Sequence, residues 1–212
     1  MKLTKYQHAC LVLEKESEKI VIDPGAFSHD FIVPHSVVAI VITHEHPDHL
    51  DESKITALLA ANPKAIIIAH ESIVGRFTQY QTQTAKLGEP FQVGQFSLRF
   101  FGGVHETIAE GIPVPPNYGV LVDERLYYPG DSFVVPEGVT VKELAVPASA
   151  PWLKLSESMR FLGTVKPSFA FPTHDAILSD DGKALVDRLL ATVAASQNTK
   201  YSRLDGTEIT LS

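Results

Sequence analysis

The stretch His44–His49 combines residue types and spacing that suit a metal site. It reads His-Glu-His-Pro-Asp-His and, with Thr43 before it, directly follows an apolar run, residues 37–42. Imidazole is the commonest protein ligand for zinc and similar metals, and carboxylate suits the same metals. His44 and His46 are two residues apart, so both rings leave the same side of the chain if strand geometry persists there. The aspartate and histidine after Pro47 follow a turn and point elsewhere, which suits a second ion. A polar turn with scattered histidines is the less favoured alternative.

Three later coordinating residues each follow an apolar run that is typical of a strand: His105, Asp131 and His174. Taken singly, a histidine after a strand is more often a capping or surface residue, and an aspartate after glycine is commonly a turn former. Glycines near two of them allow tight turns and close backbone approach. The ordered set, joined to the histidine-rich stretch, favours metal ligands over these separate interpretations.

Together these residues resemble the signature of the metallo-β-lactamase superfamily, from the first expected strand to about residue 180. The H-x-H-x-D-H motif occupies residues 44–49, and the three later residues match in order and rough spacing. Asp23, in the sequence Ile-Asp-Pro-Gly, matches the superfamily's early aspartate. The resemblance implies an α/β (α+β) fold, a four-layer αββα sandwich of two mixed β-sheets with helices on the outer faces. We expect one such domain over residues 1–212.

The resemblance also implies a site for two divalent metal ions. Its ligands form two sets with one shared member: His44, His46 and His105 for the first ion, Asp48, His49 and His174 for the second, and Asp131 bridging both. Three neutral imidazoles leave an open coordination position, which a catalytic metal needs. A metal-bound hydroxide, formed from water whose pKa falls to about 7, would attack the substrate. Asp48 and Asp131 are thereby also candidate catalytic residues. We expect zinc, with manganese or iron as alternatives that accept the same ligands.

Two residues in the N-terminal region are candidates for roles beside the metals. Asp23 is expected to accept a hydrogen bond from a ligand imidazole and fix its tautomer, although a turn residue at a strand end is an equal alternative. His8 and the alanine after it partly match a Gly-His-Ala or His-Ala element of the ascorbate-lactonase-like branch, with Gln7 in place of the glycine. His8 is a candidate catalytic residue that would protonate a leaving group or bind substrate. A strand histidine satisfied by backbone is the alternative.

Two more residues are candidates for the pocket wall. Trp152 follows a proline-rich segment, although a lone tryptophan is more often simply packed. Lys154 would contact an anion or merely be solvated. We expect residues 106–116 and 147–154 to line the pocket.

The hydrophobic pattern indicates strands with interspersed helices, which implies two sheets with helices outside. Strands are expected at residues 3–13, 20–22, 37–43, 65–69, 91–101 with a turn or bulge at Gly94, 118–122, 126–128, 144–146 and 169–171. The run 37–43 is too apolar for an edge strand, so we expect it to be central. Helices are expected at residues 52–61 and 71–83, from an N-cap at Ser156 to about residue 165, and at 182–196. A terminal hairpin is expected over 200–211, because Asp205-Gly206 is a strong turn dipeptide.

Composition limits the class of protein. A chain of 212 residues with 44% hydrophobic and 20% charged residues fits a globular domain with a sizeable core. The net charge of −7 and the lack of any Lys/Arg run argue against a nucleic-acid partner, because backbone phosphates demand clustered cations. Cys10 is the only cysteine, so the chain cannot form an internal disulfide, which fits a cytoplasmic location. No segment reads as an export signal or as the roughly 18 apolar residues of a membrane span.

These observations favour a metal-dependent hydrolase that cleaves an ester, lactone, amide or phosphodiester bond in a small molecule. An RNA- or DNA-processing nuclease of the same fold is an alternative that would need a basic groove. An iron-dependent oxidase or sulfur dioxygenase on the same scaffold is another, because the ligand types also suit iron. A non-enzymatic module is disfavoured by the intact ligand set, and a true β-lactamase by the lack of an export signal. We expect no membrane partner, and a homo-oligomer stays open.

Overall fold

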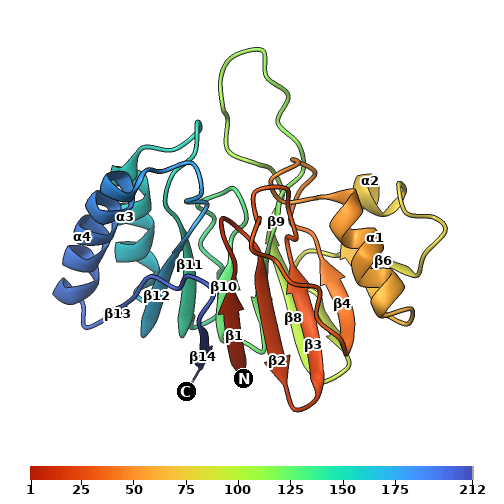
Figure 1. Ribbon diagram of the computed structural model, residues 1–212. Coiled ribbons are helices and arrows are strands. Elements are labelled where there is room, and N and C mark those ends of the chain that lie inside the picture. Colours follow the sequence, from red (N-terminus) through yellow and green to blue (C-terminus); the bar gives the residue numbers. More distant parts are fainter. Residues whose placement is uncertain (212) are drawn as a thin grey trace.

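The computed structural model describes residues 1–211 and contains two seven-stranded β-sheets that face each other. Helices α1 (Glu52–Ala61) and α2 (Glu71–Val74) pack on the outer face of the first sheet. Helices α3 (Leu155–Val165) and α4 (Asp180–Ser196) pack on the outer face of the second (Figure 1). The predicted sandwich of two sheets between outer helices is confirmed.

Both sheets are mixed. The first has the order β14-β1-β2-β3-β4-β5-β6, with strands β1 (Lys2–Lys5), β2 (Leu11–Lys15), β3 (Glu18–Ile22), β4 (Val37–Val41), β5 (Ile66–Ala69), β6 (Thr82–Thr84) and β14 (Glu208–Thr210). The second has the order β13-β12-β11-β10-β9-β8-β7, with strands β7 (Pro90–Val93), β8 (Phe96–Gly102), β9 (Tyr118–Val122), β10 (Leu126–Tyr128), β11 (Glu143–Pro147), β12 (Phe169–Thr173) and β13 (Lys200–Tyr201). Strand β4 pairs in parallel with β3 and β5, so its predicted central place is confirmed.

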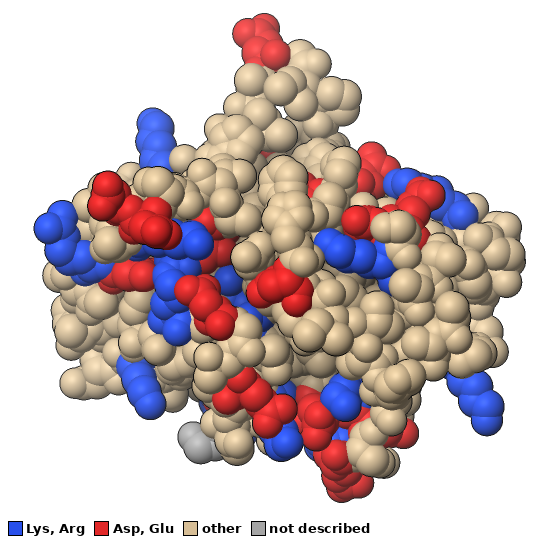
Figure 2. Space-filling model, in the orientation of Figure 1, with Lys and Arg blue, Asp and Glu red and all other residues tan. Residues whose placement is uncertain are grey.

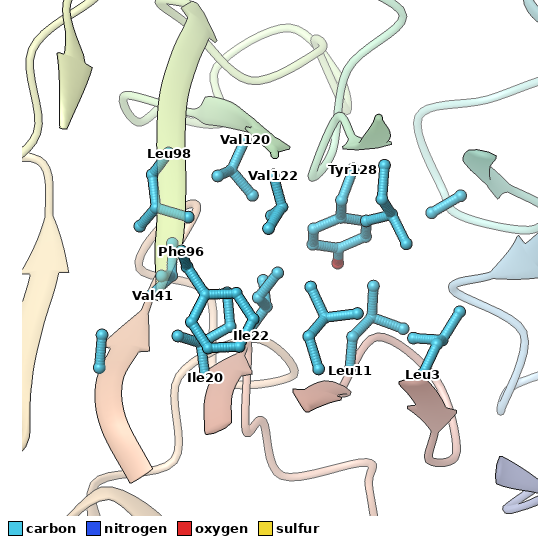
Figure 3. Packing of buried hydrophobic residues seen from close by; sticks show 14 of the residues in the cluster. Leu3, Leu11, Ile20, Ile22, Val41, Phe96, Leu98, Val120, Val122 and Tyr128 are labelled. Atoms are coloured by element: carbon cyan, nitrogen blue, oxygen red, sulfur yellow. The ribbon is translucent and has the colours of Figure 1, made fainter. Parts of the chain in front are cut away.

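The strands alternate between two apolar environments because successive side chains leave opposite faces. Leu11 and Leu13 point into the space between the sheets, whereas Val12 points toward the outer helices of the first sheet. In the second sheet, Val120 and Val122 also point into the space between the sheets. Figure 3 shows these side chains meeting those of the first sheet. Both faces of each sheet are therefore covered, which explains the near-continuous apolar runs in the sequence.

Helix α1 begins and ends where the sequence predicts. The carboxylate of Asp51 accepts hydrogen bonds from the backbone N–H groups of Ser53 and Lys54, and Asn62 ends the helix before a proline. The side chains of its buried stripe, at Ile55, Leu58 and Leu59, pack on the first sheet. The turn predicted at Gly94 is also confirmed, since it joins β7 to β8 with φ +51°.

Three local predictions are wrong. The single strand over 3–13 is two antiparallel strands, β1 and β2, because the chain turns between them with Tyr6 N–H bonded to the Cys10 carbonyl. The helix over 71–83 is only the short α2, after which β6 joins the first sheet beside β5. Helix α3 starts one residue before Ser156, because the Glu157 carboxylate accepts a hydrogen bond from the backbone N–H of Lys154 at the N-cap.

The terminal hairpin predicted over 200–211 is also wrong. Strand β13 pairs with β12 in the second sheet, whereas β14 pairs with β1 in the first. The Asp205-Gly206 dipeptide does turn the chain, with φ +71° at Gly206, and its glycine N–H bonds to the Lys5 carbonyl. Open edges in both sheets offer backbone partners to the two halves of this segment, so it links the sheets instead of pairing with itself. Among residues 1–211, every helix is too short or too polar to cross a membrane.

A buried ion-pair network joins the two sheets near this link. Lys5, at the end of β1, is fully buried and lies 3.2 Å from Asp175 in the loop after β12. Arg203 also contacts the Asp175 carboxylate and holds Asp187 of α4 with two hydrogen bonds, of 2.7 and 2.9 Å. Burial alone would raise the pKa of Asp175, but Lys5 and Arg203 together lower it, so the carboxyl is ionised at neutral pH.

Replacing Asp175 with Asn should lower the free energy of unfolding by about 3 kcal/mol, because it leaves the Lys5 ammonium buried without a counter-charge. Lys5→Met should cost less, since Asp175 keeps Arg203 and the aliphatic contacts of Lys5 are retained. Urea unfolding of the two variants measures both values. A loss below about 1 kcal/mol in Asp175→Asn would mean that the pair contributes little.

Candidate metal centre

The seven predicted ligands converge at one edge of the sandwich. The histidine-rich stretch follows β4 of the first sheet, and the three later residues follow β8, β10 and β12 of the second. Strands β8, β10 and β12 run in the same direction, so their carboxyl ends lie at the same edge. The β-strands therefore bring together residues that are as far apart in the chain as His44 and His174.

The first group contains His44, His46, His105 and Asp131, whose ligand atoms all lie within 4.8 Å of one another. The Asp131 Oδ2 atom is 3.2 Å from His105 Nε2 and 3.9 Å from His44 Nε2. All four residues except His46 are buried. This is the set predicted for the first ion, together with its bridging carboxylate.

The second group contains His8, Asp48, His49 and His174, again with ligand atoms within 4.8 Å. His174 Nε2 lies 3.2 Å from Asp48 Oδ2, and His49 Nε2 lies 3.7 Å from the same oxygen. Asp131 reaches this group as well, because its two oxygens lie 3.1 Å from His174 Nε2 and 3.2 Å from His49 Nε2. The carboxylate predicted to bridge two ions thus lies between the two groups.

Several atoms of this cluster are buried without a hydrogen-bond partner. Of the five such side-chain atoms in the described chain, four belong here: His44 Nε2, His49 Nε2, His174 Nε2 and Asp131 Oδ1. Buried polar atoms are normally satisfied, and a site that binds an ion is a standard reason for an exception. Imidazole nitrogen and carboxylate oxygen are the donors that zinc, manganese and iron accept, so the residues present fit a metal centre.

The far ring nitrogens of the histidines are held by fixed partners. Asp23 Oδ2 lies 2.7 Å from His49 Nδ1, and the same carboxylate accepts hydrogen bonds from the Thr43 backbone N–H and hydroxyl. His105 Nδ1 and His174 Nδ1 lie against backbone carbonyl groups. Protons on these Nδ1 atoms leave Nε2 free for a metal, as partners behind a ligand usually do. The contact predicted for Asp23 is present.

Three residues around the cluster have left-handed backbone conformations, which residues other than glycine rarely adopt. His8, Asp23 and His174 have φ values of +65°, +48° and +58°. Such strain persists only where the surrounding structure enforces it, and it concentrates at functional sites. A Cβ at Gly25 would lie 1.7 Å from the carbonyl oxygen of Asp48, so only glycine allows the two segments to approach this closely.

Asn117 positions Asp131 and was not found from the sequence. Its side-chain oxygen accepts a hydrogen bond from the Asp131 N–H at 3.0 Å, and its amide donates to the Pro129 carbonyl at 2.9 Å. Gly130 between them has φ +62°, and a Cβ there would lie 2.4 Å from the Asn117 side-chain oxygen. A buried asparagine at the start of a strand has no pattern that distinguishes it from a surface residue, so only the structure identifies this role.

Burial and charge divide the histidines into two kinds. Burial lowers the pKa of His44 well below its ordinary value and that of His8 to about 4, so both rings are neutral at neutral pH. Burial also acts on His174, but the Asp131 carboxylate outweighs it and raises the pKa to about 9. Burial raises the pKa of Asp131, and the neighbouring imidazoles of His49 and His174 lower it further than burial raises it. The free carboxylate is therefore ionised and attracts positive charge to the point between the two groups.

His8 is the one member of the second group that was not predicted as a ligand, and it contacts Asp48 of that group. Its Nδ1 accepts the Ala176 N–H at 3.3 Å, so its proton is on Nε2, which lies 2.9 Å from Asp48 Oδ2. The ring is fully buried. This placement favours a role in holding Asp48 over the predicted proton donation to a leaving group.

The two pocket candidates occupy different places. Trp152 donates its indole N–H to Asp131 Oδ2 at 2.8 Å and lines a depression of about 210 Å³ over the cluster, together with Ile108. Lys154 is exposed at the start of α3 and is not among the residues that line this depression. Both loops expected to line the pocket contribute to it, residues 106–116 through Ile108 and residues 147–154 through Pro151 and Trp152.

Comparison with known proteins places the chain among relatives of similar length. A family model described as the beta-lactamase superfamily domain matches residues 2–174. Protein Rv0786c of Mycobacterium tuberculosis is 37% identical over 190 residues, which cover 87% of this chain and 89% of that relative. A metal-dependent hydrolase of Carboxydothermus hydrogenoformans is 26% identical over 196 residues, covering 82% and 84% of the two chains. The structure of the metallo hydrolase Igni18 from Ignicoccus hospitalis matches with a TM-score of 0.76 at 18% identity, over 100% of this chain and 99% of that one. At this sequence identity, the likeness to Igni18 shows a shared fold and no more.

If His8 acts by holding Asp48, His8→Ala should weaken zinc binding by about 10- to 100-fold, as loss of a partner behind a ligand usually does. His8→Gln should bind zinc nearly as tightly as the unchanged chain, because its amide can still donate to Asp48. Competition with a chelating dye measures both affinities. Equal and complete loss of zinc in both variants would instead make His8 itself a ligand.

Proposed function

Because this chain belongs to the β-lactamase superfamily, we propose that it is a metal-dependent hydrolase with two divalent ions, acting on a small molecule. Metal-dependent hydrolysis is also the activity in the name of the Carboxydothermus relative. The observation that carries it is the set of four buried, unpartnered nitrogen and oxygen atoms around Asp131. Asp131 belongs to one ligand group and lies within 3.2 Å of two histidines of the other, which supports two ions. The nitrogen-rich donor set favours zinc, with manganese or iron as alternatives.

The bound metals would supply Lewis-acid chemistry, acidifying water and polarising the oxygen of the bond to be cleaved. The chain's own residues orient this centre. Trp152 holds one oxygen of Asp131 with its indole N–H, while Asn117 holds the Asp131 backbone, so the carboxylate keeps one orientation between the two groups. Asp48 stays ionised, because burial, which raises its pKa, is outweighed by contacts with His174 and His8, which lower it.

The depression over the cluster supports a small-molecule substrate. Its volume is about 210 Å³, and its lining includes Pro47, Ile108, Pro151 and Trp152 beside the candidate ligands. No lysine or arginine is among these lining residues. Basic and acidic side chains are interspersed on the face that Figure 2 shows, without the basic stripe that a nuclease needs. The predictions of no nucleic-acid partner and a cytoplasmic location remain part of this proposal, and the oligomeric state stays open.

Elemental analysis combined with a substrate panel tests the proposal. Protein purified without added metal or chelator should carry about two ions per chain. It should hydrolyse at least one of four probes: p-nitrophenyl butyrate, γ-butyrolactone, acetanilide or bis(p-nitrophenyl) phosphate. Removing the metal with a chelator should abolish the activity, and adding it back should restore the activity.

Asp131→Asn should lose at least one ion and lower kcat/KM by more than about 100-fold, because a shared ligand matters more than a residue behind a ligand. Glu45→Gln is the matched control, since Glu45 is exposed within the same motif, and it should keep both metal and activity. Full metal content and full activity in Asp131→Asn, or activity that survives the chelator, would contradict the proposed function.

A further inference from the structure

Exposed apolar side chains gather around the candidate metal centre. Among residues 1–211, nine large hydrophobic residues are exposed, and six of them lie in loops that follow β3, β8, β10 and β12: Phe27, Val104, Ile112, Val114, Val135 and Ile177. Exposed apolar residues scattered singly need no explanation, whereas a group around one site marks a binding surface.

Four of the six lie next to residues of the centre. The ring of Phe27 lies 5.1 Å from the ring of His8, and Ile177 lines a second depression that His8 also lines. Val104 precedes His105, and Val135 shares a depression with Trp152. These apolar side chains therefore lie beside residues of the centre, and together with the two described next we call them the rim of the centre.

The other two rim residues belong to the loop between β8 and β9. Ile112 and Val114 lie on this loop, which projects from the sandwich and carries two acidic residues, Glu106 near its base and Glu110 at its middle (Figures 1 and 2). Backbone hydrogen bonds between Gly103 and Asn117 close the base of the loop, and Ile108 on its first half lines the depression itself. The loop thus carries one apolar residue that lines the depression, Ile108, and two exposed apolar residues farther along.

Basic groups near the centre are offset by acidic ones. Arg160 lines a neighbouring depression together with Glu106 and Glu157. Lys183 lines another depression together with Asp175 and Asp205. Within the depression over the cluster, the only charged or titratable lining residues are the candidate metal ligands. Apart from the metals, nothing in this lining would hold an anionic group of a substrate.

We propose that the substrate is a carboxylic ester or lactone whose acyl part is apolar and uncharged, and that Ile108 and the rim contact this acyl part. The inference rests on the proposed hydrolase function and narrows its substrate class. In the reaction, water adds across the acyl carbon–oxygen bond, with the hydroxyl going to carbon and a proton to the departing oxygen. A charged acyl chain would place its charge against apolar side chains without a partner, which is unfavourable.

The test compares two esters that share a leaving group and a four-carbon acyl chain, p-nitrophenyl butyrate and mono-p-nitrophenyl succinate. The zinc-loaded protein should prefer the butyrate by at least about 10-fold in kcat/KM, because only the succinate carries a terminal carboxylate. From acetate to butyrate, kcat/KM should rise by up to about fourfold for each methylene that becomes buried. Bis(p-nitrophenyl) phosphate serves as the anionic probe.

Ile108→Asn should reduce the butyrate preference, whereas Leu185→Asn on the outer helix α4 should leave it unchanged, since Leu185 is exposed far along the chain from the loop. Binding provides a readout apart from turnover. Trp152 is the only tryptophan, so its fluorescence should respond to 2-heptanone, an uncharged ketone. Ile108→Asn should weaken the 2-heptanone response.

The outcomes separate this inference from the proposed function. Equal rates for butyrate and succinate, or cleavage of the phosphodiester alone, would overturn the inference and leave the hydrolase assignment standing. A metal-loaded protein that cleaves none of the probes would overturn both. If Ile108→Asn converts an oligomer to a monomer in size-exclusion chromatography while the ester preference is unchanged, the rim is an interface between copies and the inference fails.

Discussion

The buried carboxylate of Asp131 and the imidazole nitrogens around it form the constraint on which the rest of the structure depends. Its oxygens lie 3.1 to 3.2 Å from the Nε2 atoms of His49, His105 and His174. Where the far nitrogen of a ring carries its proton, Nε2 has only a lone pair, and lone pairs cannot satisfy one another or a carboxylate. Two cations bound among these atoms, with Asp131 between them, would satisfy all of them at once. The same atoms would otherwise be a costly defect in the core.

The fold meets this constraint through strand direction and local backbone geometry. Parallel strands of the second sheet deliver their following residues to one edge, where β4 of the first sheet delivers the histidine-rich stretch. Left-handed backbone conformations at His8, Asp23 and His174 then aim side chains that a regular strand would direct elsewhere. The network of Lys5, Asp175 and Arg203 lies directly after His174, so the ion pairs that join the sheets also anchor one end of the centre.

The sequence predicts the parts of this design that depend on local pattern. Clustered histidines and single residues after apolar runs identify the ligands, because coordinating side chains at strand ends have few other uses. Partners behind them are harder to find: Thr43 and Asn117 are ordinary residue types, and their role depends on contacts between distant segments. The terminal segment shows the same limit, since Asp205-Gly206 specifies a turn but not which sheet edges its flanks will join. The contact between Trp152 and Asp131 likewise depends on a loop path that no periodicity encodes.

The central claim is that two metal ions share Asp131, and anomalous X-ray diffraction from crystals of the zinc-loaded protein tests it most directly. Data collected on both sides of the zinc absorption edge should show two peaks. One should lie among His44, His46 and His105, the other among Asp48, His49 and His174, with the Asp131 carboxylate between them. A single peak, or two peaks that Asp131 does not join, would contradict the claim.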